Sequence, residues 1–145
     1  MAIDRQGLGL TILRLCIGAF FVFEGIGKIR WLADTSLLAG QFAVWSHAAA
    51  PGSISARYLE HIAMPGLPVF ARLVPLGEIC AGAALIAGLW TPAAAFAAFF
   101  MSLNFHVASG AIFKYGFLTN GYGLPVLGAT LALAVGGVRL KWSLR

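Results

Sequence analysis

Three ionisable residues lie inside stretches of sequence that are otherwise apolar enough to cross a bilayer: Arg14, Glu24 and Glu78. A charged side chain at membrane depth costs on the order of a few kcal/mol unless it finds a partner or a water-filled cavity, so each is a candidate functional residue. Lys28 follows Glu24 by four residues, the spacing at which two side chains meet on one helix face. We interpret Glu24 and Glu78 as candidate catalytic groups for proton exchange, a task that carboxylates perform in many enzymes.

The candidate substrate-binding residues are polar side chains at or near membrane depth: Arg14, Lys28, Asn104 and His106. With a rise of 1.5 Å per residue, Glu78 and Asn104 each lie about 18 Å from the short turn at residues 90–92. On the same scale Glu24 lies at about 24 Å and His106 at about 21 Å, so these four side chains share one half of the bilayer. Asn104 and His106 are two positions apart and point to nearly opposite faces, so they cannot both line one cavity unless the helix ends early.

The composition indicates an integral membrane protein: 60% of the 145 residues are hydrophobic, 10% are charged, and the mean hydropathy is +0.88. A transmembrane helix needs about 20 mostly apolar residues. Four stretches qualify: 8–29, 69–90, 93–111 and 122–138. We expect one domain, residues 1–145, folded as an all-α bundle of four transmembrane helices. The first stretch exceeds the apolar region of a signal peptide and contains charges, so it is expected to be a retained span.

The long connection between the first two spans contains apolar residues at helical spacing. Leu38, Phe42 and Trp45 precede Pro51, and Tyr58 and Leu59 follow it. This pattern predicts two short amphipathic helices with a break at the proline. They either lie along the membrane interface or form a lid over the bundle. In the second case the histidines of this segment would lie near its mouth; otherwise they are solvated loop side chains.

The net charge of +5 does not indicate nucleic-acid binding, because the basic residues lie at span ends and in loops, where lysine and arginine reach lipid headgroups. They occur at both ends of the spans, so charge alone gives no orientation. Cys16 and Cys80 both fall in expected spans, which argues against a disulfide or a metal site. We interpret them as small apolar residues, with a redox thiol as the alternative.

The segment from Arg14 to Lys28 resembles the first helix of DoxX-type membrane proteins, in which an arginine is followed by a glycine four residues later, and a glycine and a lysine come near the helix end. Gly77-Glu78, Gly82 and the run from Gly88 to Pro92 resemble the second helix and hairpin turn of that family. The similarity is strongest to the DoxD branch, the small subunit of thiosulfate:quinone oxidoreductase. It implies a multi-pass bundle in a bacterial plasma membrane with cytoplasmic termini, and a role in passing electrons from a reduced sulfur compound such as thiosulfate to quinone.

Three interpretations of the charges remain open. In the first, the chain is a quinone-linked oxidoreductase subunit, and Arg14 and Lys28 attract an anionic substrate or stabilise a quinone oxyanion. No flavin motif is present, so no bound cofactor is expected, quinone is the candidate substrate, and the electrons come directly or through a second subunit. In the second, the charges pair with each other and fix the register of the helices. In the third, the bundle is an accessory protein that binds quinone, lipid or another amphiphile, or that docks a larger complex or a second copy.

Overall fold

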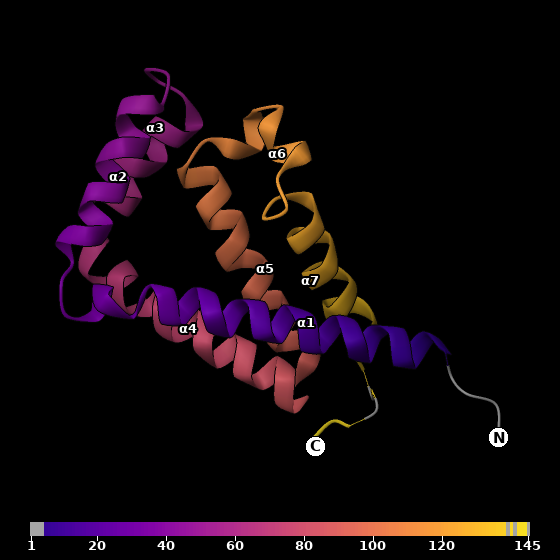
Figure 1. The fold of residues 1–145 in the computed structure, drawn as a ribbon. Helices are drawn as coiled ribbons and strands as arrows, with labels where there is room; N and C mark the ends of the chain where they lie inside the picture. The colour runs from indigo at the N-terminus through magenta and orange to yellow at the C-terminus, as the bar shows by residue number, and fades with distance from the viewer. Residues whose placement is uncertain (1–4, 139, 141, 145) are drawn as a thin grey trace.

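The computed structural model describes residues 5–138, 140 and 142–144, and every regular element among them is helical (Figure 1). Four longer helices build the bundle: α1 (Arg5–Gly27), α4 (Leu67–Ala87), α5 (Thr91–Ala108) and α7 (Leu124–Gly136). Shorter helices connect them: η1 (Ile29–Leu32), α2 (Ser36–Ala48), α3 (Ile54–Tyr58), the π-helical η2 (Leu59–Ala63), η3 (Ala111–Phe113) and α6 (Gly116–Thr119).

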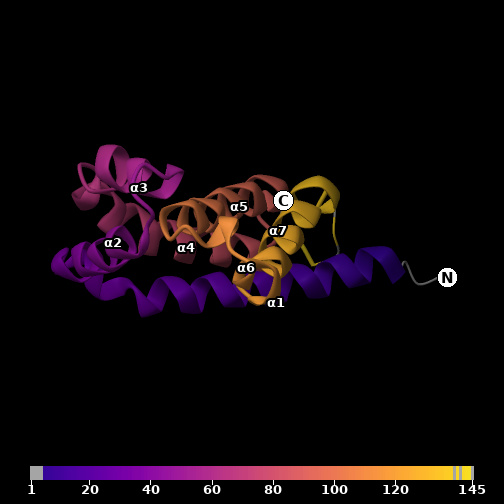
Figure 2. The ribbon, with the colours of Figure 1, turned by 90° about the horizontal axis from the view of Figure 1, so that it is seen from above.

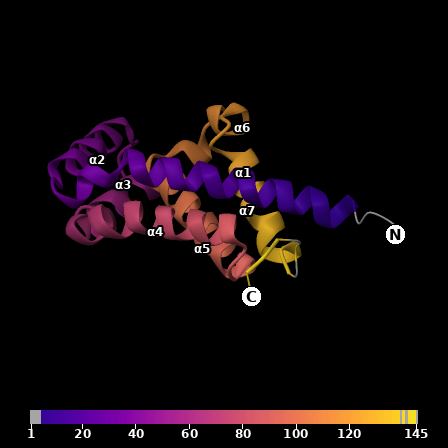
Figure 3. The same ribbon diagram turned by 60° about the horizontal axis from the view of Figure 1, so that its bottom comes forward.

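The longer helices form two pairs. α1 and α4 lie side by side with opposite directions, and α5 and α7 form a second pair that rises from the first (Figures 1 and 3). A short turn joins α4 to α5, so the two pairs are also linked through the chain. α1 also contacts α7, which links the two pairs a second time.

Three of these helices, α1, α4 and α5, are long and apolar enough to cross a membrane by length and composition. α7 is equally apolar but has only 13 residues, whereas the sequence predicts a span over 122–138. The fourth span therefore stays a prediction. The outer faces of the long helices expose large apolar side chains, such as Phe23 at 73% and Val69 at 62%. Such faces suit a lipid environment, in which apolar side chains need no burial in protein.

The turn between α4 and α5 depends on a left-handed residue. Gly88 has φ +72°, which is easily adopted only without a side chain. The N–H of Leu89 donates to the Ala84 carbonyl oxygen at 2.8 Å, a bond that closes the end of the helix. α4 therefore ends at Ala87, before the expected boundary at residue 90, and α5 begins at Thr91 with Pro92 in its first turn.

α1 and α4 approach so closely that the glycines at their contact leave no room for a Cβ atom. A Cβ atom added to Gly82 would lie 2.6 Å from the Gly18 carbonyl oxygen and 2.7 Å from the Val22 nitrogen. The residues of α1 that face this contact and the bundle interior are buried: Arg14, Gly18, Phe21 and Gly25. At 100° per residue, Arg14, Gly18, Phe21, Gly25 and Lys28 fall within one narrow band of a helix, so the sequence predicts that this band faces other helices rather than lipid. The structure confirms the prediction for the four buried residues. Close contact between small residues is common in membrane helices, because it maximises van der Waals packing.

The two short helices predicted around Pro51 are present: α2 ends before this proline and α3 begins after it. Figure 2 shows α2 and α3 gathered beside the end of α1 and the start of α4. Six buried residues form an apolar cluster here, contributed by α2, η2, α4 and α5: Leu38, Phe42, Leu59, Ala63, Ala71 and Ala108. We call α2, α3 and η2 the loop helices. Both of their histidines, His47 and His61, are exposed.

We predict that Gly82→Ala lowers the free energy of unfolding by about 1 to 3 kcal/mol, because the added methyl group meets backbone atoms of α1 that cannot move aside cheaply. Thermal unfolding in mild detergent measures this as a lower melting temperature. Gly128→Ala on α7 is the matched control, since a Cβ there meets nothing within 4 Å. Equal melting temperatures for the two variants would contradict the close α1–α4 contact.

Candidate functional site

The charged residues at the end of α1 form one cluster with a residue of α4. Lys28 Nζ lies 2.8 Å from Glu24 Oε2 on the preceding turn, and 3.0 and 2.9 Å from the two carboxylate oxygens of Glu78. The side chains of Lys28, Glu24 and Glu78 are 16%, 33% and 5% exposed. With both carboxylates ionised the cluster carries one net negative charge. The way α1 packs against α4 thus brings one cation, Lys28, together with two carboxylates that can each hold a proton.

A cavity of about 180 Å³ adjoins this cluster. Its walls come from α1, α4, α5, the start of α7 and the residues before it: Phe20, Phe21, Glu24, Lys28, Glu78, Ser102, Phe105, His106, Tyr122 and Val126. The three α5 residues follow the i, i+3, i+4 spacing of one helix face. An engineered apolar cavity of roughly 150 Å³ holds a benzene molecule. The cavity is therefore of the size of one six-membered ring.

Aromatic rings form part of the cavity wall. The rings of Phe20 and Tyr122 have centroids 5.6 Å apart, and Lys28 Nζ lies 5.4 Å from the centre of the Phe105 ring. An ammonium group at that distance is attracted by the face of the ring. His106 is 8% exposed, and its Nε2 lies 2.7 Å from the Tyr122 carbonyl oxygen. The cavity thus combines stacking surfaces with a charged end, as small-molecule sites commonly do.

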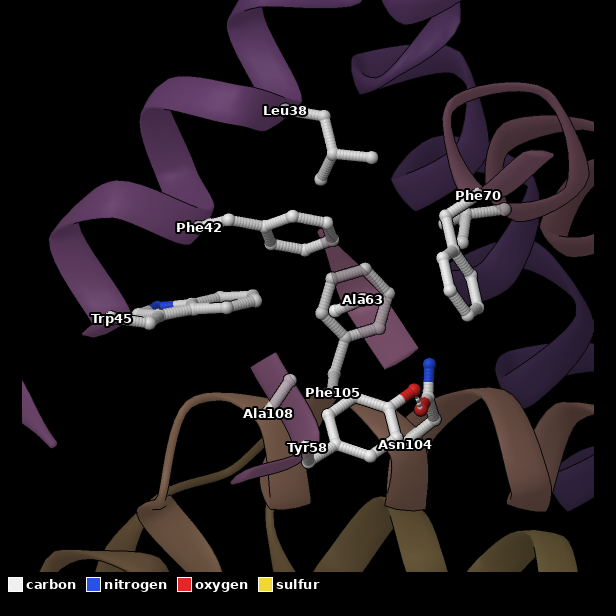
Figure 4. Close-up of a pocket in the computed structure, with 10 residues that line it drawn as sticks. Leu38, Phe42, Trp45, Tyr58, Ala63, Phe70, Asn104, Phe105 and Ala108 are labelled. Carbon is white, nitrogen blue, oxygen red and sulfur yellow. Dashed lines mark hydrogen bonds between the residues drawn. The ribbon is translucent and has the colours of Figure 1, made fainter. Parts of the chain in front are cut away.

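Asn104 faces away from this cavity, as the sequence predicts from its separation from His106 by two residues. It lines a second cleft, between α5 and the loop helices, where the Tyr58 hydroxyl donates a hydrogen bond to Asn104 Oδ1 (Figure 4). Burial raises the pKa of the Tyr58 hydroxyl, with the hydrogen bond to Asn104 acting in the opposite direction, so the donor proton is present at neutral pH. The open volume of this cleft is about 10 Å³, room for no more than a water molecule. Asn104 therefore holds α3 against α5.

Arg14 lies far from the other candidates, near the middle of α1. Fourteen residues of helix separate it from Lys28, or about 21 Å. Its side chain is completely buried and donates to the Ser143 hydroxyl and to the Trp142 carbonyl oxygen, each at 3.0 Å. A substrate bound by Arg14 would therefore lie apart from the Lys28 cluster. At its own place the Arg14 guanidinium holds the C-terminal segment.

The structure brings together four of the six sequence candidates: Glu24, Lys28, Glu78 and His106. Sequence reasoning missed the aromatic walls. Phe105 could have been predicted as a wall residue, because Ser102, Phe105 and His106 share one face of α5. Tyr122 could not, since it precedes α7 and belongs to no periodic pattern. Helical spacing places Tyr58 only among the apolar residues of a loop helix and gives no sign of its hydrogen bond to Asn104.

In the described part of the chain, no group of three or more His, Cys, Asp or Glu side chains could hold a metal ion. Cys16 and Cys80 are free, and both are exposed on the outside of the bundle. Both side chains therefore lie on outward helix faces rather than inside the bundle. The interpretation of the two cysteines as small apolar residues stays a prediction.

The fold and the site are those of a helical membrane protein with a polar cluster buried between its apolar helices. The family model described as DoxX matches residues 9–108, which is well over half of the chain. The chain therefore belongs to the DoxX family. Comparison with curated proteins finds no match, and comparison with solved structures finds none either.

We predict that Lys28→Met destabilises the fold by about 3 kcal/mol or more, because it leaves two carboxylates facing each other at a largely buried position. The double variant Lys28→Met/Glu78→Met should recover most of this loss, since it removes a buried charge together with its partner. Unfolding by denaturant in detergent measures both. Lys114→Met, an exposed lysine, is the control and should change stability by no more than about 0.5 kcal/mol. A double variant no more stable than Lys28→Met would argue against the pairing.

The Tyr58 bond to Asn104 generates a second prediction. Tyr58→Phe removes the hydroxyl donor and should weaken docking of the loop helices by about 1 kcal/mol. Hydrogen–deuterium exchange of the peptide over residues 54–63 should become faster, while exchange in α1 and α4 stays unchanged. Tyr115→Phe is the matched control, because Tyr115 is 80% exposed. Unchanged exchange over residues 54–63 in Tyr58→Phe would show that the bond does not hold this segment.

Proposed function

We propose that this DoxX-family protein is the quinone-binding membrane subunit of a redox complex of the DoxD type, in which a reduced sulfur compound such as thiosulfate supplies the electrons. The observation that carries the proposal is the ring-sized cavity of about 180 Å³ beside the Lys28 cluster. A quinone head is one substituted six-membered ring with two oxygens. It would stack on the aromatic walls and place an oxygen at the charged end.

The chemistry of quinone reduction assigns a task to the cluster. Conversion of a quinone to a hydroquinone takes two electrons and two protons. In this proposal the electrons come from the sulfur compound through a second subunit. Glu24 and Glu78 together relay one proton to the ring oxygen that lies near them, and water supplies the second proton to the other ring oxygen. Lys28, held between the two carboxylates at 2.8 to 3.0 Å, stabilises the negative charge that remains after the transfer.

The membrane arrangement supports access of such a substrate. Quinones dissolve in the hydrocarbon core, so a ring can enter a cavity between apolar helices without crossing water. Exposed tryptophans, Trp90 at 84% and Trp142 at 73%, flank one end of the bundle, and Tyr115 at 80% lies near the other. Aromatic side chains at both ends are typical of membrane interfaces. We place the protein in the bacterial plasma membrane, with α7 as the fourth crossing and both termini in the cytoplasm.

One observation favours a second candidate, a non-catalytic amphiphile-binding or accessory protein. Both oxygens of Glu78 already bind Lys28, so the cluster can serve by itself as the bond that joins α4 to the end of α1. A protein of this kind would hold a quinone or lipid in the cavity, or dock a larger complex, without any proton transfer.

Glu78→Gln distinguishes these functions. In membranes that contain the chain and its native partner, supplied with thiosulfate and a short-chain quinone, we expect the variant to reduce quinone about 100-fold more slowly than the wild type, because a proton donor is lost. Loss of quinone absorbance in the ultraviolet measures the rate. Glu60→Gln is the matched control, since Glu60 is an exposed carboxylate on η2 with a 74% accessible side chain.

Two further results decide between the alternatives. Ser102→Leu fills the cavity without touching the charges, so quinone that copurifies with the wild type should be absent from this variant after solvent extraction. Quinone that copurifies with the wild type but is never reduced with thiosulfate would favour the accessory protein. A wild type without quinone, together with a Glu78→Gln variant that only melts at a lower temperature, would leave the cluster a structural role.

A further inference from the structure

The Lys28 ammonium has no hydrogen-bond donor left for a ligand. An ammonium group carries three N–H donors. Four protein acceptors surround Lys28 Nζ: Glu24 Oε2 at 2.8 Å, the Glu24 carbonyl oxygen at 3.3 Å, and the two Glu78 oxygens at 2.9 and 3.0 Å. Its donors are therefore occupied by Glu24 and Glu78. A ligand in the cavity meets the carboxylates rather than a free cation.

Those carboxylates still have acceptor capacity. Each ionised carboxylate offers about four lone-pair sites on its two oxygens. Glu24 uses Oε2 for Lys28, and its other oxygen makes no hydrogen bond to any residue that the structure describes. The Glu24 side chain is 33% exposed and lines the cavity, so this oxygen can accept a hydrogen bond from a bound molecule.

His106 adds an acceptor on another wall. The Tyr122 carbonyl oxygen can only accept, so the 2.7 Å contact requires the proton to be on His106 Nε2. In the neutral imidazole Nδ1 then carries a lone pair. Nδ1 has no hydrogen bond within the described part of the chain, and His106 forms a wall of the cavity while its side chain is more than nine-tenths buried. The other hydroxyl groups of the cavity belong to Ser102 and Tyr122, and each can donate or accept a hydrogen bond.

We propose that the cavity selects an uncharged ring whose hydroxyl groups donate hydrogen bonds, and that His106 is the residue that determines this specificity. This inference rests on the proposed function and names the state of the substrate that the site holds most tightly, the hydroquinone rather than the quinone. The net negative charge of the cluster disfavours anions. In this proposal the anionic sulfur compound gives up its electrons elsewhere. Lys28 then does not attract an anionic substrate but holds the two carboxylates that face the ring.

Wild-type protein alone tests the proposal. The probes are tetramethylhydroquinone, its dimethyl ether and the corresponding quinone, whose fully substituted rings do not add to the free thiols of Cys16 and Cys80. Binding to the full chain in nanodiscs is measured without oxygen by equilibrium dialysis. We expect the hydroquinone to bind at least about tenfold more tightly than the ether or the quinone, the effect of one or more hydrogen bonds to unoccupied acceptors. Thiosulfate should not displace it.

Variants of His106 locate the preference. His106→Phe keeps a ring that can pack against Phe117 but removes the acceptor, and should lower hydroquinone affinity about tenfold while leaving ether affinity unchanged. His106→Gln retains a donor for the Tyr122 carbonyl and an acceptor for the ligand, and should restore the preference. His61→Phe, at an exposed histidine, is the matched control. The ratio of hydroquinone to ether affinity is a readout that a purely structural role of His106 would not move.

The outcomes separate this inference from the proposed function. If the quinone or the ether binds the wild type as tightly as the hydroquinone, or if thiosulfate displaces the ring, the inference is overturned while ring binding stands. If none of the three rings binds, the proposed function fails as well. If His106→Phe does not fold, the comparison of probes on the wild type and on His106→Gln still gives the answer.

Discussion

The close contact between α1 and α4, in which glycines let the two backbones approach, is the constraint on which the candidate site depends. Gly18 and Gly82 let the two backbones meet, and a Cβ on either would lie within 3 Å of the other helix. Helices separated by ordinary side chains pack 8 to 10 Å apart. The glycines let α1 and α4 approach closely, and this approach brings Lys28 Nζ within 3.0 Å of both oxygens of Glu78. Packing therefore sets the geometry of the cluster, and the ion pair then stabilises the packing at the end of α1.

The polar residues of the apolar helices serve three separate places. Asn104 binds Tyr58 and fixes a loop helix on α5, and Arg14 binds residues 142–143 and fixes the end of the chain. The Lys28 cluster lies beside a cavity of about 180 Å³ that has aromatic walls and can hold a ring. This distribution explains how a small chain can contain several membrane-depth polar groups and one candidate site: a polar group that is fully used in holding the fold is not available to a ligand.

The sequence could predict the positions of the helices and the buried band of α1, because hydropathy and a 3.6-residue period determine both. It also predicted that Asn104 and His106 face different ways, which follows from helix geometry. It could not predict the partner of Arg14, since Ser143 lies 129 residues away and meets it only through the return of the chain. The aromatic wall from Tyr122 was equally hidden, because irregular backbone places it. The length of α7 was overestimated, since apolar residues continue past both ends of the helix while glycines at 123 and 137 bound it.

The short α7 makes the bundle uneven in thickness. Its 13 residues rise about 20 Å, while the hydrocarbon core of a bilayer is about 30 Å thick. With α7 as the fourth crossing proposed above, lipids beside this helix would thin, or headgroups and water would come deeper, at a cost of fractions of a kcal/mol per Å of hydrophobic mismatch. The start of α7 is also where Val126 borders the cavity. In that proposed arrangement the hydrocarbon layer is thinnest beside the helix that borders the cavity, and the protein is expected to favour thin membranes over thick ones.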